Sequence, residues 1–236
     1  MITKKAAQER GATRTDWLES YHTFSFGQYY DPAYMGFSDL RVINDDRVIA
    51  GAGFGTHGHK DMEIITYVLS GALSHRDSMG NGSTLRHGDV QIMSAGSGVT
   101  HSEFNASNTE AVHFLQMWIV PNKQSVTPRY QEKSFDAVLQ QEGFHEVVNF
   151  CDTNEALHIH QEARLLIGRI KAGEQQYLSF NPKRKAWVHI ATGAVAFNNH
   201  TAQAGDGFAV ELETLLNFDA LCDSEVLIFD LTDKGV

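Results

Sequence analysis

The stretch Gly51–Gly71, GAGFGTHGHKDMEIITYVLSG, carries most of the information about the fold of this 236-residue chain. A glycine-rich approach leads into His57 and His59, and an apolar run from Glu63 to Leu69 ends at the next glycine. Apolar runs of this length, bounded by glycine, are typical of buried β-strands. The stretch therefore predicts a strand, preceded by two histidines whose i, i+2 spacing puts them on one face of an extended segment.

The rest of the chain has the same character. Short or alternating apolar runs are separated by glycine- and asparagine-rich turns, and helical periodicity is weak nearly everywhere. Nothing in the pattern alternates strands with helices, so we predict an all-β fold, a sandwich or a barrel. The predicted strands are Leu40–Ile43, Glu63–Leu69, Ala72–Arg76, Val90–Ser94, Val99–Phe104, Val112–Ile119, Leu165–Ile170, Ala186–Ala191, Ala194–Phe197, Gly207–Val210 and Val226–Phe229.

Two segments half a chain apart resemble each other. Tyr67–Leu73 reads YVLSGAL and precedes a Gly-Asp turn, and His189–Val195 reads HIATGAV and precedes another. A duplicated β-domain explains this spacing. We predict that the polar segment from about Pro121 to Gln141 connects the two copies. The predicted units are residues 1–130 and residues 131–236.

Composition and charge exclude several classes of function. The chain is 42% hydrophobic and 10% aromatic, enough for a core, and no apolar run approaches the ~20 residues of a membrane span. Its formal net charge is −10, which disfavours direct binding to nucleic acid and leaves a protein partner open. The charged N-terminal segment has no signal-peptide pattern, so we expect a cytoplasmic protein.

A second His-x-His pair is less informative. About 0.6 such pairs are expected by chance in a chain this rich in histidine. His158, His160 and Glu162 alternate with apolar residues, which is how the solvated face of a half-exposed strand looks. We therefore expect these three side chains to face solvent.

The first pair has a partner further along the chain. His101 and Glu103 follow the glycine turns at Gly88 and Gly96–Gly98. If both segments line the inside of a barrel, three imidazoles and one carboxylate meet around a common point. Such a set suits Fe(II), Mn(II), Ni(II), Cu(II) or Zn(II) and leaves coordination positions open for chemistry. Spacing alone fits hydrogen-bonded core histidines nearly as well.

The chain resembles a known family at this point. Glycine, five residues, His-x-His and a following glutamate are similar to the first motif of the cupin superfamily. More narrowly, the sequence resembles the pirin family of two-domain cupins. The similar segments are HTFSFGQYYDP (22–32), MGFSDLRVINDD (35–46), HKDMEIITYVLSGALSHRDSMGN (59–81), HGDVQIMSAGSGVTHSE (87–103), PRYQEKSFDAV (128–138), WVHIATGAV (187–195) and AGDGFA (204–209).

The resemblance implies a bicupin, with two double-stranded β-helix barrels in one chain and one divalent metal in the N-terminal barrel. Carried over by position, the metal ligands are His57, His59, His101 and Glu103. Fe(II) is the first choice of metal, with Mn, Ni, Cu, Co or Zn as alternatives. General cupins take their carboxylate from the first motif, which would be Glu63. We assign Glu103 as the ligand and expect Glu63 to orient a histidine.

The resemblance also implies an activity. Bacterial pirins are similar to quercetin 2,3-dioxygenases, which open the ring of a flavonol with dioxygen and release carbon monoxide. Glu103, as ligand and base together, would take the proton from the flavonol hydroxyl. The alternative is a non-enzymatic regulator, in which the redox state of the metal controls binding to a transcription-related protein.

Two further expectations concern the barrel interiors. Apolar residues around the first barrel either line a planar substrate pocket or pack in the core, and core packing is the commoner role; they are Phe24, Phe26, Phe54, Phe114 and Met117. The second barrel is expected to bind no metal, because the internal repeat places unsuitable side chains at the ligand positions. Those residues are Ser179, Asn181, Phe218 and Ala220.

Overall fold

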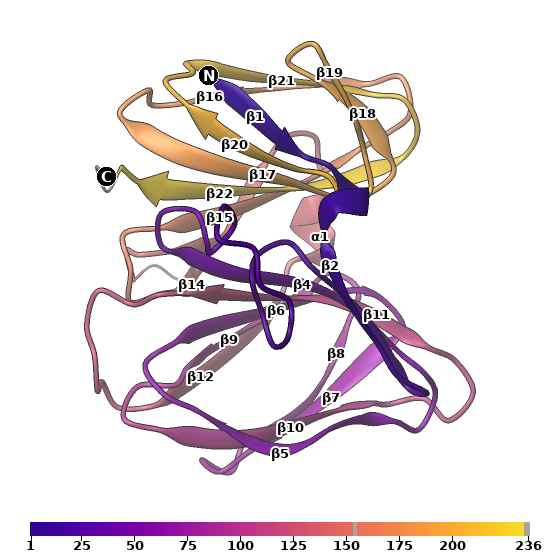
Figure 1. The fold of residues 1–236 in the computed structure, drawn as a ribbon, viewed down its shortest axis with the longest axis vertical. Coiled ribbons are helices and arrows are strands. Elements are labelled where there is room, and N and C mark those ends of the chain that lie inside the picture. The colour runs from indigo at the N-terminus through magenta and orange to yellow at the C-terminus, as the bar shows by residue number, and fades with distance from the viewer. Residues whose placement is uncertain (153–154, 234–236) are drawn as a thin grey trace.

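A computed structural model describes residues 1–152 and 155–233, and it confirms the all-β prediction. Two β-barrels are stacked one on the other (Figure 1). Helical structure in the described residues is limited to η1 (Ala7–Glu9) and α1 (Asp136–Leu139). Neither has the length or the apolar content of a helix that crosses a membrane.

The first barrel consists of a seven-stranded and a four-stranded sheet. The strand order is β12-β9-β6-β11-β4-β3-β2 in the large sheet and β5-β10-β7-β8 in the small one. Every pairing in these two sheets is antiparallel. The strands are β2 (Gly11–Arg14), β3 (Leu18–His22), β4 (Leu40–Val48), β5 (Gly53–His59), β6 (Glu63–Ser70), β7 (Ala72–Asp77), β8 (Gly82–Arg86), β9 (Asp89–Ser94), β10 (Val99–Asn105), β11 (Val112–Ile119) and β12 (Arg129–Ser134).

The second barrel repeats this plan. Its large sheet has the order β1-β20-β17-β22-β15-β13-β14, and its small sheet has the order β16-β21-β18-β19. The strands are β1 (Ile2–Lys5), β13 (His145–Asn149), β14 (Leu157–His158), β15 (Arg164–Ile170), β16 (Gln175–Ser179), β17 (Arg184–Thr192), β18 (Ala194–Phe197), β19 (His200–Gln203), β20 (Gly207–Glu211), β21 (Leu215–Ala220) and β22 (Ser224–Thr232).

The N-terminal strand of the chain belongs to the second barrel, not to the first. β1, from the N-terminus, pairs with β20 of the second barrel, and β12 occupies the matching place beside β9 in the first. The predicted boundary after residue 130 falls inside β12. The segment Pro121–Gln141 is therefore more than a connection, because it supplies an edge strand and α1.

Matching glycines mark the repeat in the structure. Gly71 ends β6 with a φ of +76°, and Gly193 ends β17 with a φ of +79°. A Cβ on either would also lie 2.7 Å from the Ala111 carbonyl oxygen or 2.2 Å from the Ser224 Oγ. Only glycine fits both the backbone conformation and the space at these two turns.

The largest apolar core lies between the barrels, where the two seven-stranded sheets pack face to face. In β11 the odd-numbered Leu115 and Met117 point into this core, together with Leu165 and Trp187 of the second barrel. The even-numbered residues of β11 point the other way, into the first barrel, since strand side chains alternate. This alternation fixes which residues can reach the interior site.

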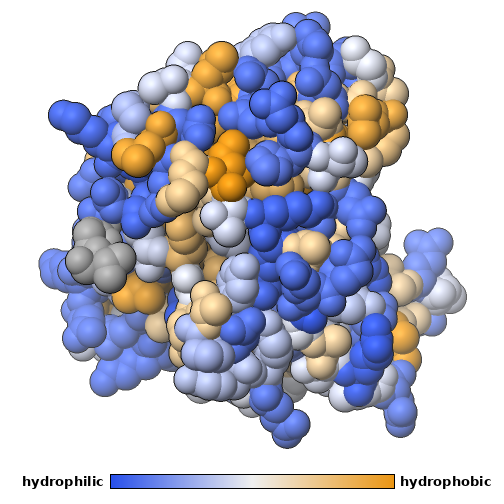
Figure 2. Space-filling model, turned by 45° about the horizontal axis from the view of Figure 1, so that its top comes forward, coloured by the Kyte–Doolittle hydropathy of each residue, from blue (hydrophilic) through white to orange (hydrophobic). Residues whose placement is uncertain are grey.

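The surface in Figure 2 is mostly hydrophilic. On the face drawn in Figure 2, hydrophobic residues lie in small separate groups within a mostly hydrophilic surface. Exposed large apolar side chains are spread along the chain, among them Tyr30, Leu212 and Leu221. Single exposed apolar residues of this kind are common on protein surfaces.

Candidate metal centre

Two neighbouring strands of the small sheet of the first barrel bring the histidines together. β5 and β10 are antiparallel, and their register places His57 directly opposite His101. The register shifts between His101 and Glu103, where β5 has one extra residue between Phe54 and His57. His57, His59 and Glu103 line the cavity of the first barrel, and the ring of His101 meets those of His57 and His59.

The three imidazoles converge on one point. The Nε2 atom of His101 lies 2.9 Å from Nε2 of His59 and 3.0 Å from Nε2 of His57. An ion held at about 2.1 Å by two nitrogens at right angles brings those nitrogens about 3.0 Å apart. The spacing of these three nitrogens therefore fits adjacent ligands of a divalent transition metal.

A backbone contact fixes the tautomer of His57. Its Nδ1 lies 2.8 Å from the carbonyl oxygen of Gly55. Because a carbonyl can only accept, Nδ1–H donates and the lone pair remains on Nε2, the atom that faces the other histidines. This is the usual way in which a protein orients a metal-binding imidazole.

Burial keeps the other two histidines neutral. Burial, with a smaller effect of the neighbouring imidazoles, lowers the pKa of His59 to about 4 and that of His101 to about 3. Neutral imidazole is the form that binds a metal, so protons do not compete with an ion here near pH 7.

Glu103 extends from β10 toward the large sheet and is only 1% exposed. Gln116 Nε2 donates to its Oε2 at 2.7 Å, and Thr66 Oγ1 donates to its Oε1 at 3.5 Å. Burial raises the pKa of Glu103 to about 7 despite these two hydrogen bonds. A donor atom of Glu103 also lies within 4.8 Å of donor atoms of His101 and His75.

His75 is a residue that the sequence analysis did not single out. It is buried on β7, directly across from Glu103 on β10, and its ring stacks on Tyr130 with centroids 4.9 Å apart. The signal was present in the alternation of β7, whose inward-facing residues are Leu73, His75 and Asp77.

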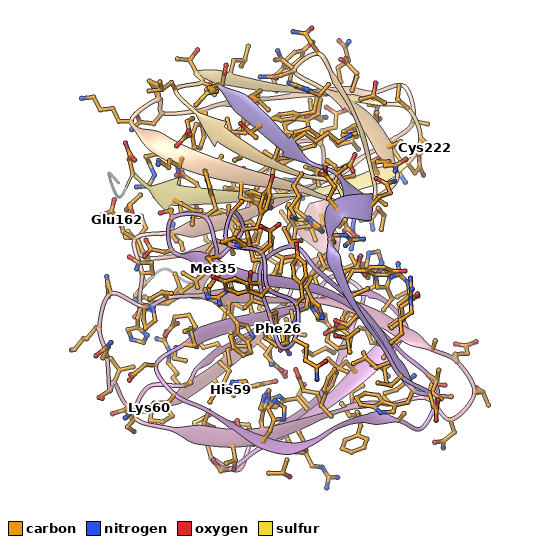
Figure 3. All side chains as sticks on the ribbon, viewed as in Figure 1. Phe26, Met35, His59, Lys60, Glu162 and Cys222 are labelled. Carbon is orange, nitrogen blue, oxygen red and sulfur yellow. The ribbon has the colours of Figure 1, made fainter. Side chains whose placement is uncertain are left out.

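A cavity of about 430 Å³ opens beside the histidines and has the size of a small-molecule site. Its walls are aromatic: the rings of His59 and Trp118 are 5.0 Å apart, and Phe26 meets Trp118 edge-on. Figure 3 shows Phe26, on the loop after β3, above His59. The cavity is lined by Thr13, Trp17, Leu18, Ser20, His22, Phe26, Asn44, Asp46, Phe54, Gly55, His57, His59, Glu103, Gln116 and Trp118.

Of the five apolar residues expected around the first barrel, some line the cavity and others pack in the core. Phe26 and Phe54 line the cavity. Phe24 and Met117 pack between the barrels, and Phe114 packs in the core of the first barrel. For these three the commoner role, core packing, is the correct one.

Sequence reasoning missed a buried polar row across the large sheet. Strand register places His22, Asn44, Gln116, Thr66 and Gln91 side by side on β3, β4, β11, β6 and β9. His22 is held at both ends, by Asn44 Oδ1 and Thr13 Oγ1, each at 2.8 Å. The available signal was at least one polar residue among the apolar residues on the inward face of each strand.

Glu63 orients a histidine, but not one of the clustered three. Its Oε1 lies 3.2 Å from Nδ1 of His160, and Ser94 Oγ donates to its Oε2 at 2.9 Å. The expectation that His160 faces solvent is therefore wrong. The strand ends at His158, and the chain then turns so that His160 reaches the first barrel, whereas Glu162 is exposed.

The interior of the second barrel is filled by apolar side chains. At the positions corresponding to the ligands, Phe218 and Ala220 are packed in this core. Asn181 lies in a turn, where its Oδ1 accepts a hydrogen bond from the backbone N–H of Lys183. Among the described residues, the histidine and carboxylate groupings suited to a metal lie in the first barrel.

Comparison with known proteins gives consistent matches over nearly the whole chain. The family described as Pirin matches residues 3–119, and the family described as quercetinase C-terminal cupin domain matches residues 150–231. A protein named quercetin 2,3-dioxygenase from Escherichia coli (strain K12) is 47% identical over 231 residues, which cover 98% of this chain and 99% of that protein.

Two further relatives extend the comparison. A pirin-like protein of Caulobacter vibrioides is 38% identical over 231 residues, which cover 98% of this chain and 99% of that protein. The crystal structure of the bacterial pirin YhhW from Escherichia coli in complex with nickel(II) has a TM-score of 0.92 and 45% identity, and covers 98% of this chain and 99% of that one. The fold and its duplication are thus shared with solved relatives.

Proposed function

This chain belongs to the pirin family, and from that premise we propose that it is a metal-dependent dioxygenase that opens the ring of a flavonol such as quercetin. The observation that carries the proposal is the convergence of three imidazole nitrogens beside an aromatic cavity that Glu103 also lines. Quercetin 2,3-dioxygenase is also the name of the 47% identical relative.

The proposed metal ligands are His57, His59, His101 and Glu103. Their donor set of three nitrogens and one oxygen suits a divalent transition metal, and the nitrogen spacing matches it. Fe(II) is our first choice, and the nickel(II) complex of the relative keeps Ni(II) among the candidates. When bound, such an ion supplies Lewis acidity, which lowers the pKa of a flavonol hydroxyl.

Glu103 is the proposed general base. Gln116 holds its Oε2 at 2.7 Å, while Oε1 has only the long contact from Thr66. The carboxylate can therefore take the proton of the flavonol 3-hydroxyl on Oε1. In the metal-free chain burial raises the pKa of Glu103 to about 7, and a bound cation would favour the carboxylate form, which is the form that accepts a proton.

The cavity walls position the rest of the substrate. Phe26 meets Trp118 edge-on in the cavity wall, and Trp17 meets Phe54 edge-on, with ring centroids 5.1 Å apart. Flat aromatic faces hold a planar ring system by offset or edge contacts. They also exclude water from the place where the deprotonated substrate meets dioxygen.

The test is oxygen uptake by the metal-loaded protein. Purified chain, loaded with Fe(II) or Ni(II), is mixed with quercetin, and dioxygen loss and quercetin absorbance are followed together. Equal consumption of both is expected, and it should disappear in His57→Ala but persist in His158→Ala, which changes the other His-x-His pair. If no metal supports dioxygen consumption with flavonols, the enzyme proposal fails and the regulator alternative gains ground.

A further inference from the structure

Two neighbouring aspartates on β4 have opposite environments. Asp45 faces away from the barrel interior, and its carboxylate contacts Arg10 and Arg47 at 3.0 Å and His113 at 2.7 Å. Asp46 faces inward and lines the cavity. Its Oδ1 has no hydrogen-bond partner within residues 1–152 and 155–233, although the carboxyl is hydrogen-bonded to Ser20.

A carboxylate oxygen without a hydrogen-bond partner in a cavity wall indicates that a ligand binds there. Asp46 is 3% exposed, so water does not solvate it freely. A buried polar atom without a partner costs about 1–3 kcal/mol, and native proteins rarely leave one without a role. Because the atom belongs to a cavity wall, a bound molecule that brings a hydroxyl donor would satisfy it.

The sheet register gives the position of Asp46 relative to the metal centre. On β11, Trp118 contacts His59, Gln116 contacts Glu103, and Phe114 lies directly opposite Asp46 on β4. Each step of two residues along a strand is about 7 Å, so Asp46 lies about 13 Å along the sheet from the level of Trp118. Gln116, and with it Glu103, is only one such step from Asp46, whereas the level of His59 is two steps away, so Asp46 faces a part of a bound ligand that lies away from the histidines.

We propose that Asp46 accepts a hydrogen bond from a substrate hydroxyl remote from the metal, so that the cavity selects polyhydroxylated aromatic compounds. The inference rests on the proposed function and refines it, since it names the part of the substrate that is recognised. Glu103 takes the proton of the hydroxyl at the metal, and Asp46 accepts a hydrogen bond from a second hydroxyl of the same substrate.

The ionisation of Asp46 is consistent with this role. Burial, with Asp45 and Glu103 nearby, raises the pKa of Asp46 to about 7. A phenolic hydroxyl that donates to Oδ1 favours the ionised carboxylate, and hydrogen bonds to charged groups are among the stronger ones. Recognition by such a bond discriminates well against an analogue that lacks the hydroxyl, because the buried acceptor is then left unpaired.

The test compares two flavonols in one variant. Quercetin carries several ring hydroxyls, and 3-hydroxyflavone keeps only the hydroxyl needed at the metal. In Asp46→Asn we expect the ratio of kcat/KM for quercetin to kcat/KM for 3-hydroxyflavone to fall about tenfold or more, mostly through KM. Asp16→Asn, at an exposed aspartate, is the matched control and should leave the ratio at its wild-type value.

Equilibrium binding separates this inference from the proposed function. Trp17 and Trp118 line the cavity, so quenching of their fluorescence reports binding without turnover. If the wild type binds quercetin more tightly than 3-hydroxyflavone and Asp46→Asn removes the difference, the inference stands even where no turnover occurs. It is overturned if Asp46→Asn keeps the wild-type preference, or if the wild-type protein shows none. Metal content and circular dichroism establish that the variant is folded.

Discussion

The Nε2 atoms of His59 and His101 lie 2.9 Å apart, although the two residues are 42 positions apart in the chain. Burial lowers the pKa of both imidazoles, so they face each other as neutral rings rather than as a repelling charged pair. Such an arrangement brings two nitrogen lone pairs toward one point. It is costly to build unless an ion, or at least a shared proton, occupies that point.

Removal of His101 should empty the site. In His101→Ala we expect bound metal to fall from about one equivalent per chain to less than about 0.1 equivalent. The reason is that His101 lies between the other two histidines, so its loss removes the nitrogen that both of them face. Elemental analysis of protein exposed to one metal and then desalted measures this. His158→Ala should retain the wild-type metal content, and an unchanged content in His101→Ala would contradict the assignment.

Glu103→Gln should separate metal binding from chemistry. The amide still coordinates weakly but is a poor base, so we expect at least half of the metal to remain while kcat/KM falls about 10²- to 10⁴-fold. Steady-state kinetics at measured metal occupancy give the comparison. Glu63→Gln alters an equally buried glutamate bound to His160 and should keep both metal and activity. Equal activity in Glu103→Gln and the wild type would remove Glu103 as the base.

Asp46 should make the metal-free protein less stable as the pH rises. Its pKa is raised from 3.8 to about 7 by burial, so the folded state holds a proton that the unfolded chain releases. Stability from this group is therefore present below pH 3.8 and is lost as the pH rises toward 7. In Asp46→Asn the gain in unfolding free energy over wild type should grow from pH 4 to pH 8 by a few kcal/mol.

Denaturant unfolding at several pH values measures this gain. Asp16→Asn provides the baseline, because an exposed aspartate should show no such trend. A gain of Asp46→Asn that is flat or that shrinks with rising pH would show that the carboxyl is not destabilised by burial.

The barrels should unfold together, because a buried contact joins them. The hydroxyl of Tyr67, on β6, donates to Oε1 of Glu225 on β22 of the second barrel, and Arg169 Nε donates to the same atom at 2.8 Å. Tyr67→Phe should lower the unfolding free energy by about 1–3 kcal/mol. Tyr177→Phe, at a hydroxyl on the surface, should cost less than about 0.5 kcal/mol. Two separate thermal transitions in the wild type would mean that the barrels unfold independently.

Much of the fold could be predicted from the sequence, because buried strands show as short apolar or alternating runs. The strands Val112–Ile119 and Ala194–Phe197 were predicted with the bounds that the structure has. β4 was predicted to end at Ile43 but continues to Val48 through Asn44, Asp45 and Asp46. Consecutive polar residues are unfavourable in a strand, but here Asn44 and Asp46 face the cavity of the first barrel and Asp45 faces Arg10, Arg47 and His113 on the other side.

The site was accessible in part for the same reason. The histidine pairs were found because i, i+2 spacing on neighbouring strands is a local pattern. Gln116 and His75 were missed, because their role depends on which strands become neighbours across the barrel. His160 was misread because the strand that was expected to carry it ends at His158. Partners of that kind are set by tertiary register, which a single sequence does not display.

The most direct measurement is the anomalous difference density of crystals soaked with Ni(II) or Fe(II), recorded at the absorption edge of the metal. One peak is expected in the first barrel, about 2.0–2.2 Å from Nε2 of His57, His59 and His101 and from one carboxylate oxygen of Glu103. A peak among His75, His101 and Glu103 instead, or no peak in the first barrel at saturating metal, would contradict the metal centre on which the proposed chemistry depends.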